Sequence, residues 1–327
     1  MRFVLAPLAG FTDAPFRLMC QEGGADLTYT EMVSAAALAH GHSPTNHLME
    51  TMAGEGPVGC QIFGANENDI AVATREISRI ASRFTELNLN AGCPMKKITQ
   101  CGAGAKLVED PAKIGRLLKV MKENTDLPIT LKTRIGPHPQ NTNIFEILDA
   151  AQEAGISGLT VHARYTSQCQ CHGGPVHLDV LEEVVRRARV PVTGNGSVVD
   201  AKTAQEMAKT GVESIMIGRG CLANPHLFAE LKASFRPASD TPAPSAPNAL
   251  SLCARHLDYV LAFRELLATR FPGDHVPSVD GFASVKMHVH LFRYFNGRPG
   301  AAALRARLNS IRTLAEIRSV LAAAARM

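Results

Sequence analysis

Residues 88–94 read Asn-Leu-Asn-Ala-Gly-Cys-Pro, a stretch in which a thiol lies beside two carboxamides. Gly92 allows backbone angles that are closed to other residues, and Pro94 favours an extended or turn conformation at Cys93. We therefore expect the Cys93 thiol on a stiff loop at the end of a strand. A lone cysteine is more often a small buried apolar side chain. Here the neighbouring carboxamides indicate hydrogen bonding to a ligand and favour a functional thiol.

Two glycine-containing segments later in the chain are candidates for binding a phosphate. They read Gly194-Asn195-Gly196 and Ile217-Gly218-Arg219-Gly220, and each follows a short apolar run. Glycine lets backbone N–H groups approach a phosphate closely, and Arg219 could add a charge-assisted hydrogen bond. Glycines at strand ends are often mere turns, but two such segments on adjacent strands favour a phosphate-bearing cofactor.

Three further side chains would suit a flavin ring. Lys132 could place a cation beside the flavin edge that gains negative charge on reduction, and Gln61 offers both a donor and an acceptor. His162 could support the same edge as Lys132. Taken singly, Lys132 could instead form a salt bridge with a nearby acid, and His162 could be a hydrogen-bonded core histidine. These alternatives stay open.

Short apolar runs rich in β-branched residues alternate with amphipathic stretches and define the elements that must position these side chains. The predicted strands are Phe3–Ala6, Asp26–Thr30, Val58–Phe63, Thr85–Asn90, Pro128–Arg134, Gly158–His162, Pro191–Asn195 and Ser214–Gly218. The predicted helices include one opening at Ala14–Arg17 and those at Asn68–Arg83, Pro111–Asn124, Ile144–Ala154, Leu178–Ala188 and Ala201–Thr210. Eight strands with intervening helices predict a (β/α)8 TIM barrel, and the strand count disfavours the competing doubly wound sheet.

The polar and special residues fall at the ends of these strands, where a TIM barrel carries its active site. In strand order they are Pro7, Glu31, Gln61, Cys93, Lys132 and Arg134, His162 and Arg164, Asn195 and Gly196, and Gly218 and Arg219. Because all eight strands agree, one active site at the mouth of the barrel is predicted.

Composition places the chain among ordinary globular proteins. It has 327 residues, 46% of them hydrophobic and 20% charged. No apolar run approaches the roughly 20 residues that span a bilayer, and the N-terminal apolar stretch is too short for a signal peptide. The eight cysteines form no disulfide-scaffold pattern, so reduced thiols are expected. We predict a cytoplasmic, monomeric protein without a membrane partner.

Charge and composition divide the chain into three parts. Residues 1–235 form the predicted barrel, 236–250 a linker rich in Pro and Ala, and 251–327 a small helical domain. The segment 251–327 holds eleven basic and five acidic residues, a net charge of +6, whereas residues 1–250 carry −2. A basic tail indicates an anionic partner such as RNA, although a solvated helical face explains the charge equally well.

Taken together, six motifs resemble those of the tRNA-dihydrouridine synthases. They are Ala-Pro-Leu-Ala-Gly-Phe-Thr-Asp-Ala-Pro-Phe-Arg (6–17), Thr-Glu-Met-Val (30–33), Asn-Leu-Asn-Ala-Gly-Cys-Pro (88–94), Lys-Thr-Arg-Ile-Gly (132–136), Val-His-Ala-Arg (161–164) and Ile-Gly-Arg-Gly (217–220). They occur in the family's order over roughly residues 2 to 230. The tail, with Lys286-Met287-His288 and Gly297-Arg298-Pro299-Gly300, resembles the family only loosely.

The resemblance implies an FMN-dependent reduction of uridine in tRNA, with NADPH as the reductant. The flavin would pass a hydride to C6 of a uracil drawn out of its stack, because that edge is inaccessible in folded RNA. Cys93, which matches the family's active-site cysteine, would protonate C5 from the opposite face. The basic helical domain would bind the tRNA backbone, which predicts affinity that falls with salt.

The resemblance also implies roles for individual residues. The flavin would be bound by Pro7, Leu8 and Ala9 through backbone atoms, by Gln61 and Lys132, and by nearby His162. Its phosphate would be bound by Asn195, Gly196, Ser197, Gly218 and Arg219. Asn90 would contact the target uridine, and Arg134 and Arg164 would meet RNA or cofactor anions.

The chain departs from the family pattern in three places. The family usually has Gln-x-Tyr after Val-His-Ala-Arg, whereas residues 168–173 read Gln-Cys-Gln-Cys-His-Gly and lack the tyrosine. Ser197 replaces an acid that usually follows Asn-Gly in the seventh loop. The linker rich in Pro and Ala is an unusual joint, so the position of the tail does not follow from the resemblance.

Two cysteine and histidine groupings are compatible with other chemistry. Cys169-x-Cys171-His172 and His288-Val289-His290 lack a second ligand pair at zinc spacing, so no metal site is predicted. Cys101 follows Cys93 closely enough for a regulatory disulfide, but chance spacing explains the pair better.

Two other functions compete with this interpretation. A flavin barrel could reduce a small enone or pyrimidine, but a small substrate needs no basic helical appendage. A protein that binds and remodels tRNA without chemistry would need neither Cys93 nor the flavin-type pair Gln61 and Lys132. Tail and site together therefore favour the enzyme acting on tRNA.

Overall fold

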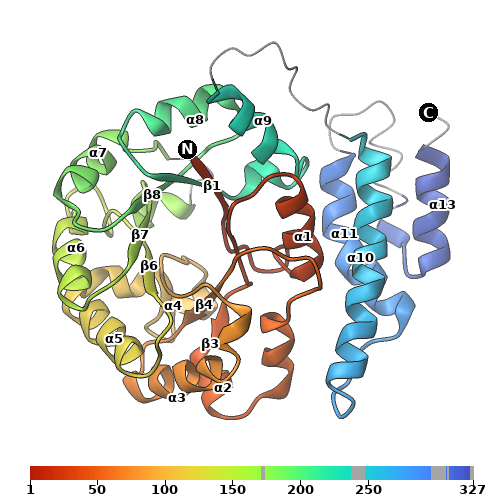
Figure 1. Ribbon diagram of the computed structural model, residues 1–327, viewed down its shortest axis with the longest axis horizontal. Helices are drawn as coiled ribbons and strands as arrows, with labels where there is room; N and C mark the ends of the chain where they lie inside the picture. The colour runs from red at the N-terminus through yellow and green to blue at the C-terminus, as the bar shows by residue number, and fades with distance from the viewer. Residues whose placement is uncertain (171–173, 237–246, 296–306, 308, 325–327) are drawn as a thin grey trace.

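The computed structural model describes residues 1–170, 174–236, 247–295, 307 and 309–324, and its centre is a curled parallel sheet (Figure 1). The strands are β1 Arg2–Leu5, β2 Thr28–Tyr29, β3 Val33–Ser34, β4 Val58–Phe63, β5 Glu86–Ala91, β6 Ile129–Arg134, β7 Gly158–His162, β8 Val192–Asn195 and β9 Ser214–Ile217. Their order is β1-β9-β8-β7-β6-β5-β4-β2, and β3 also pairs with β4. The sheet closes where the Leu5 N–H donates to the Leu27 carbonyl over 2.9 Å. The predicted TIM barrel is confirmed.

The second strand of the barrel is interrupted, which the sequence did not predict. Tyr29 pairs with Gly59, and Val33 pairs with Ile62, so one extra residue lies between these two pairs. Such a bulge bends a strand and redirects its side chains. Here it places Glu31 so that its carboxylate accepts a hydrogen bond from the Gly10 N–H in the loop after β1.

Helices surround the barrel in the predicted alternation. The α-helices are α1 Ala14–Glu22, α2 Ala35–Ala39, α3 Glu67–Ser78, α4 Lys96–Thr99, α5 Pro111–Glu123, α6 Ile144–Glu153, α7 Leu178–Arg187, α8 Ala201–Ala208 and α9 Leu227–Ser234. The 3-10 helices are η1 Ser43–Met49, η2 Ala81–Arg83, η3 Gly104–Glu109, η4 Thr166–Gln170 and η5 Arg219–Cys221. Caps begin several helices: the Asp13 side chain accepts the Phe16 N–H, and Asp200 forms a capping box with Thr203. The helix predicted over 68–83 ends at Ser78, before the separate turn η2.

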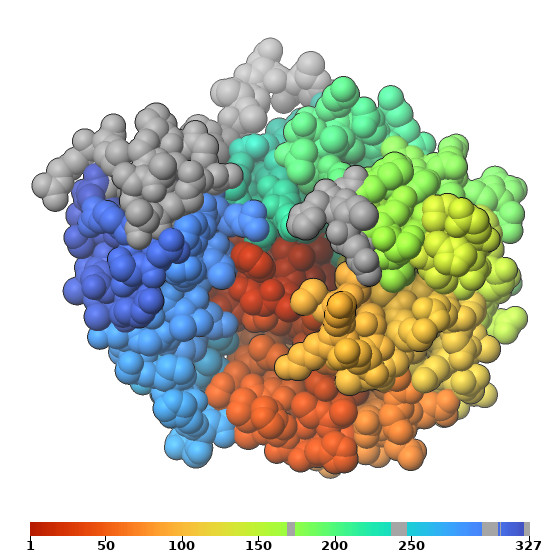
Figure 2. Space-filling view, turned by 180° about the vertical axis from the view of Figure 1, so that it is seen from behind, coloured from red at the N-terminus to blue at the C-terminus, as the bar shows by residue number. Residues whose placement is uncertain are grey.

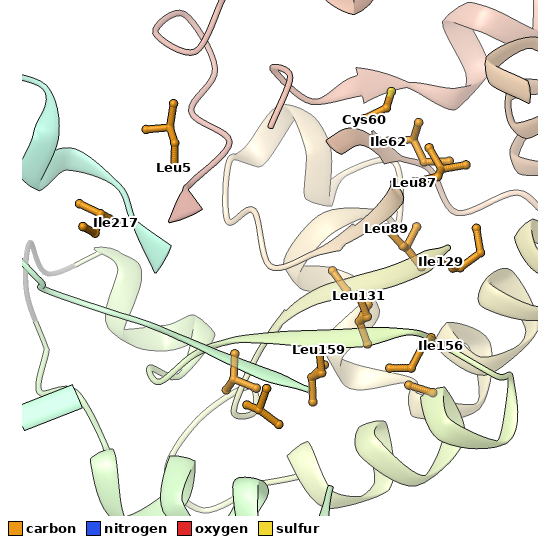
Figure 3. Packing of buried hydrophobic residues seen from close by; sticks show 14 of the residues in the cluster. Leu5, Cys60, Ile62, Leu87, Leu89, Ile129, Leu131, Ile156, Leu159 and Ile217 are labelled. Atoms are coloured by element: carbon orange, nitrogen blue, oxygen red, sulfur yellow. The ribbon is translucent and has the colours of Figure 1, made fainter. Parts of the chain in front are cut away.

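The strands alternate between an apolar outer face and a mixed inner face. Leu87 and Leu89 of β5 and Leu131 of β6 belong to the main apolar core, which lies between sheet and helices (Figure 3). Inside the barrel, a smaller apolar cluster joins the first, second and last strands; it consists of Val4, Ala6, Leu27, Tyr29 and Met216. The opposite inner wall is polar, with hydrogen-bonded side chains from β4, β5 and β6. Because successive side chains of a strand point to opposite faces, the outward residues pack against the helices and the polar residues lie inside the barrel.

A second helical unit follows the barrel and lies beside α1 (Figure 1). Its described helices are α10 Ala249–Arg270, α11 Val279–Tyr294 and α13 Leu314–Ala324. They share an apolar core with Ala14 and Met19 of α1. Because Asn248 caps α10, the tail helices begin two residues before the predicted start at residue 251. Most of the predicted linker (237–246) and the tail segment 297–300 lie outside the described residues. No helix in the described ranges is long and apolar enough to cross a membrane.

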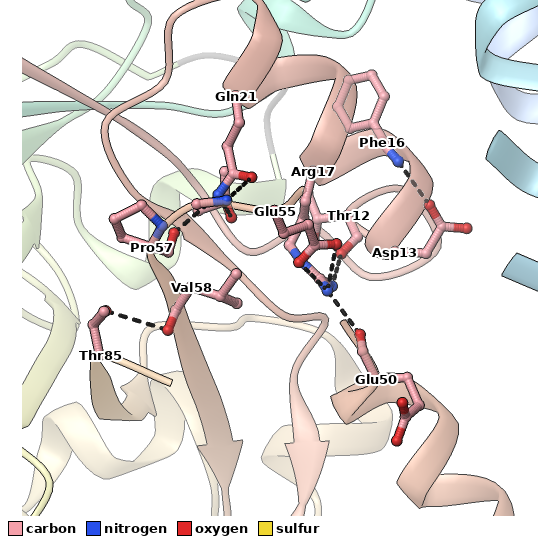
Figure 4. Close-up of polar contacts among 12 residues, drawn as sticks. Thr12, Asp13, Phe16, Arg17, Gln21, Glu50, Glu55, Pro57, Val58 and Thr85 are labelled. Carbon is pink, nitrogen blue, oxygen red and sulfur yellow. Dashed lines mark hydrogen bonds and ion pairs between the residues drawn. The ribbon is translucent and has the colours of Figure 1, made fainter. Parts of the chain in front are cut away.

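A fully buried ion pair fastens α1 to the segment that precedes β4 (Figure 4). The Arg17 guanidinium contacts the Glu55 carboxylate at 3.0 Å, and the two side chains are 0% and 2% exposed. Arg17 also donates to the backbone carbonyls of Glu50 and Thr12, at 2.8 and 3.1 Å. Burial raises the pKa of Glu55, and the charge of Arg17 opposes this shift. Either charge would be costly to bury alone.

Replacing Arg17 by methionine should therefore lower the free energy of unfolding by about 3–5 kcal/mol, because Glu55 would stay buried without its partner. Urea denaturation measures this change. Arg79→Met is the matched control, since Arg79 is 73% exposed in its pair with Glu76 and should change stability little. Equal stability of the two variants would contradict the argument.

Candidate active site

A cavity of about 700 Å³ opens at the carboxyl ends of the barrel strands. In Figure 2, the red N-terminal segment lies at the centre of this face, framed by gold, teal and blue segments. Every predicted site residue except Gln61 lines the cavity: Pro7, Leu8, Ala9, Asn90, Cys93, Lys132, Arg134, His162, Arg164, Asn195, Gly196, Ser197, Gly218 and Arg219. Five cations line it, and no carboxylate does so within the described part of the chain. Its charge suits an anionic ligand.

The loop that carries Cys93 is held from both sides. The Asn90 Oδ1 accepts hydrogen bonds from the N–H groups of Gly92 and Cys93, each at 3.0 Å. Arg134 donates to the Gly92 carbonyl at 2.7 Å, and the Ala105 N–H donates to the Cys93 carbonyl at 2.8 Å. The thiol itself is half-buried and not in a disulfide. These hydrogen bonds hold the loop in addition to the backbone restriction expected from Gly92 and Pro94.

Gln61 lies beneath the cavity rather than in its wall. Its Nε2 donates to the Asn88 Oδ1 at 2.7 Å, and its Oε1 accepts from the Asn90 Nδ2 at 2.8 Å. Asn90 also contacts the Met32 sulfur at 3.6 Å. Because β4 and β5 are neighbouring strands, the inward side chains of Gln61, Asn88 and Asn90 hydrogen-bond to one another. Of these three, only Asn90 lines the cavity. In this arrangement Gln61 and Asn90 brace the cysteine loop.

Lys132 presents a cation whose charge is easily lost. Burial, together with the charge of Arg134, lowers the pKa of Lys132 to about 7, and Cys93 acts in the opposite direction. Its Nζ donates to the Asn195 Oδ1 at 3.2 Å. Asn195 is oriented in turn, because its Nδ2 donates to the Met216 carbonyl at 2.9 Å. The partner of Lys132 is therefore a carboxamide and not the acid that the alternative interpretation required.

His162 is uncharged in this setting. Burial lowers its pKa well below the usual value, and the charges of Arg134 and Lys132 add to the effect. Its Nε2 lies 3.2 Å from the Arg164 Nη1, which can only donate. This contact assigns the histidine proton to Nδ1. His162 thus offers a neutral donor beside several cations.

The last two loops form a constricted, cation-bearing corner. Ser197 has a φ of 52° and is the only non-glycine with positive φ in the described ranges. Its hydroxyl accepts a hydrogen bond from Arg164 at 2.6 Å. A Cβ on Gly220 would lie 2.4 Å from the Val198 carbonyl oxygen, so only glycine fits there. Arg219 is exposed at the cavity wall, and no carboxylate of a described residue pairs with it.

Helix α11 of the tail contributes to the cavity, which the sequence did not predict. Lys286 contacts the Asp13 carboxylate at 3.1 Å and the Glu31 carboxylate at 4.0 Å. The charge of Asp13 raises the pKa of Lys286. Two turns further on, Arg293 lines the cavity and lies 6.0 Å from the centre of the Phe11 ring. The only signal for Arg293 in the sequence was the net charge of the tail.

Apolar side chains complete the wall and were also missed. Phe11, Met32, Met216 and Leu222 line the cavity. Met95 and Val199 line it too, although they are 62% and 55% exposed. A flat aromatic or heteroaromatic ligand could pack against such a wall.

The remaining candidates lie apart from this chemistry. Residues 171–173 and the side chains of Cys169 and Gln170 are outside the described residues, including the position of the missing tyrosine. The ring centre of His290 lies 4.6 Å from that of Phe16 and 4.4 Å from that of His256. Cys101 is exposed, and its thiol donates to the Lys97 carbonyl at 3.5 Å. Among described residues, no three His, Cys, Asp or Glu side chains gather as metal ligands do.

Comparison with known proteins gives consistent matches over nearly the whole chain. A family model described as dihydrouridine synthase (Dus) matches residues 4–326. The tRNA-dihydrouridine synthase B of Pseudomonas putida is 30% identical over 310 residues, which cover 94% of this chain and 86% of that protein. A probable tRNA-dihydrouridine synthase of Mycobacterium tuberculosis is 31% identical over 326 residues, 96% of this chain and 79% of its own. The tRNA-dihydrouridine synthase B of Klebsiella pneumoniae is 34% identical over 232 residues, 71% of each chain.

The lowered pKa of Lys132 predicts a pH dependence of stability. Folded Lys132 loses its proton near pH 7, whereas the unfolded chain keeps it until about 10.5, so unfolding takes up a proton in this window. Raising the pH should therefore stabilise the wild type relative to Lys132→Met, by about 1–2 kcal/mol between pH 7 and pH 9. Urea denaturation at both pH values tests this. In the control variant Lys96→Met, at an exposed position, the free energy of unfolding should change with pH as it does in the wild type. If Lys132→Met showed that same change, the lowered pKa of Lys132 would be contradicted.

Proposed function

The chain belongs to the dihydrouridine synthase family, and we propose that it reduces the C5–C6 bond of a uridine in tRNA, with bound FMN and with NADPH as reductant. The observation that carries the proposal is a free thiol on a braced loop inside a cavity lined by five cations. Such a cavity matches a phosphate-bearing cofactor on one side and a nucleotide on the other.

The residues present fit FMN. Arg219 and the glycine loops after β8 and β9 would hold its phosphate, since glycine permits close approach and Arg219 pairs with no carboxylate in the described part of the chain. Lys132 and the neutral His162 would face the ring edge that becomes negative. Leu8 and the other residues of the loop after β1 would cover the ring through backbone and apolar atoms. Bound and reduced, FMN would supply a hydride to C6 of the uracil.

The Cys93 thiol would complete the reduction as the general acid. Hydride addition at C6 leaves negative charge at C5 and on the adjacent carbonyl, and the S–H proton then forms the new C5–H bond. The thiolate left behind takes a proton from solvent before the next turnover, and NADPH supplies the two electrons. Asn90 and Arg134 hold the loop, so the thiol does not have to reorganise for the transfer.

The mouth of the cavity supports a polynucleotide substrate. Arg293 reaches it from α11, and exposed Lys96 and Lys97 begin the short helix α4 directly after the cysteine loop. Exposed Met95 lies between these lysines and Cys93. Cations on both sides of the opening would bind phosphates that flank the uridine, while the apolar rim would pack against bases. This role extends the proposed tRNA-binding region from the tail to the barrel.

Replacing Cys93 by alanine should leave FMN bound but lower the rate of dihydrouridine formation by about 10²–10⁴-fold, since general acid catalysis contributes on that order. The measurements are the flavin absorption spectrum and mass spectrometry of digested tRNA. Cys101→Ala is the control, because Cys101 is exposed and its thiol bonds only to a backbone carbonyl. Normal turnover by the Cys93→Ala variant would show that Cys93 is not the general acid.

Replacing Arg293 by alanine should weaken tRNA binding and reduce its salt dependence, because one phosphate contact is lost. The slope of log Kd against log salt should fall by about 0.7–0.9, and the Lys96→Ala/Lys97→Ala pair by about twice that. Titration at several salt concentrations gives the slopes. Arg79→Ala, at the residue that caps the C-terminus of α3 outside the cavity, should leave the slope unchanged. If the slope were unchanged in both Arg293→Ala and the Lys96→Ala/Lys97→Ala pair, the mouth of the cavity would not be a tRNA-binding surface.

A further inference from the structure

The inner face of β5 carries three polar side chains in succession, Glu86, Asn88 and Asn90. Glu86 lies at the start of the strand, at the opposite end of the barrel from Cys93. We propose that Glu86 is a positioning residue for proton transfer from Cys93, acting through a directed chain of hydrogen bonds. This inference rests on the proposed function, because it concerns the acid of that reaction.

The chain of hydrogen bonds is continuous from the carboxylate to the cysteine loop. Thr130 donates to the Glu86 Oε1 at 2.6 Å and accepts from the Asn88 Nδ2 at 2.8 Å. The Asn88 Oδ1 accepts from Gln61 at 2.7 Å, and the Gln61 Oε1 accepts from Asn90 at 2.8 Å. The Asn90 Oδ1 then accepts the two loop N–H groups described above. All three carboxamides and the hydroxyl are buried.

The two ends of this chain determine its direction. A backbone N–H can only donate, so the Asn90 Oδ1 must face the loop and its Nδ2 must face Gln61. An ionised carboxylate can only accept, so the Thr130 hydroxyl must point its hydrogen at Glu86 and leave a lone pair for Asn88. Each intermediate carboxamide therefore has one orientation that satisfies both neighbours. Without the acceptor at Glu86, only the loop end would still order the chain, and the Thr130 hydroxyl could turn its hydrogen away from Glu86 toward Asn88.

Tyr29 strengthens the acceptor end. Its hydroxyl donates to the same Glu86 oxygen, and burial together with the Glu86 charge raises the Tyr29 pKa well above its usual value. Tyr29 therefore stays a donor. A Cβ on Gly59 would lie 2.5 Å from the Tyr29 ring, so glycine at this position allows the ring to reach Glu86. The Glu86 carboxylate thus accepts hydrogen bonds from both Tyr29 and Thr130.

Reversal of the chain would act directly on the reactive thiol. A turned Asn90 would present its NH2 group to the N–H groups of Gly92 and Cys93, and donors would then face donors. The loop would lose its support from β5 and keep those from Arg134 and Ala105. Cys93 would become more mobile and more accessible, and its alignment with C5 would be lost.

The test compares Thr130→Val, which breaks the chain at an isosteric site, with Thr130→Ser, which restores the hydroxyl. Glu86→Leu removes the acceptor and provides a second break should one variant fold poorly. Thr210→Val is the matched control, because Thr210 is buried and its hydroxyl donates only to the Met207 carbonyl. For each variant we would measure kcat and KM for tRNA, the melting temperature, and the rate of Cys93 alkylation by iodoacetamide, resolved by peptide mass spectrometry.

We expect kcat to fall on the order of tenfold in Thr130→Val and Glu86→Leu, with KM for tRNA within about twofold, as for a misplaced catalytic group. Cys93 alkylation should rise by about threefold or more, and Thr130→Ser should restore both values. If either kcat or alkylation in both broken variants matched Thr210→Val, the proposal would be overturned. A wild type that forms no dihydrouridine would refute the proposed function alone, since the alkylation comparison would still report on the chain.

Discussion

The hydrogen bonds from the Asn90 side chain to the cysteine loop are the contact on which the site depends. A carboxamide inside a barrel must find partners for all its polar atoms, because burial without them costs free energy. Asn90 meets this requirement with Gln61 below and two backbone N–H groups above. The same contacts that satisfy the barrel interior therefore orient Cys93. Stability and function are coupled through one side chain.

A second coupling joins the helical tail to the face of the barrel that carries the cavity. Lys286 on α11 lies between Asp13, which caps α1, and Glu31, which accepts the Gly10 N–H. One partly buried cation thus contacts carboxylates that support the helix and the loop forming the first wall of the cavity. The same α11 helix carries Arg293 to the cavity mouth. The tail is therefore a structural part of the site as well as a carrier of positive charge.

The sequence predicted the barrel and the gathering of its site because both depend on local patterns. Alternation along strands such as β5 and glycines at strand ends are visible in a single chain. The role of Gln61 was not predictable, because whether it faces a ligand or a neighbour depends on the register between β4 and β5. Arg293 was missed because its position depends on how α11 packs against α1. The positive φ of Ser197 was hidden since serine rarely adopts it.

The cavity holds its cations at an energetic cost that an anion would relieve. Burial and mutual repulsion lower the pKa of Lys132 to about 7 and keep His162 neutral. A carboxylate placed among them would remove this repulsion, but it would also occupy the space and charge that a phosphate needs. In this corner the Arg164 guanidinium donates instead to the neutral Ser197 hydroxyl. Mutual repulsion among these cations would favour the binding of a phosphate-bearing ligand.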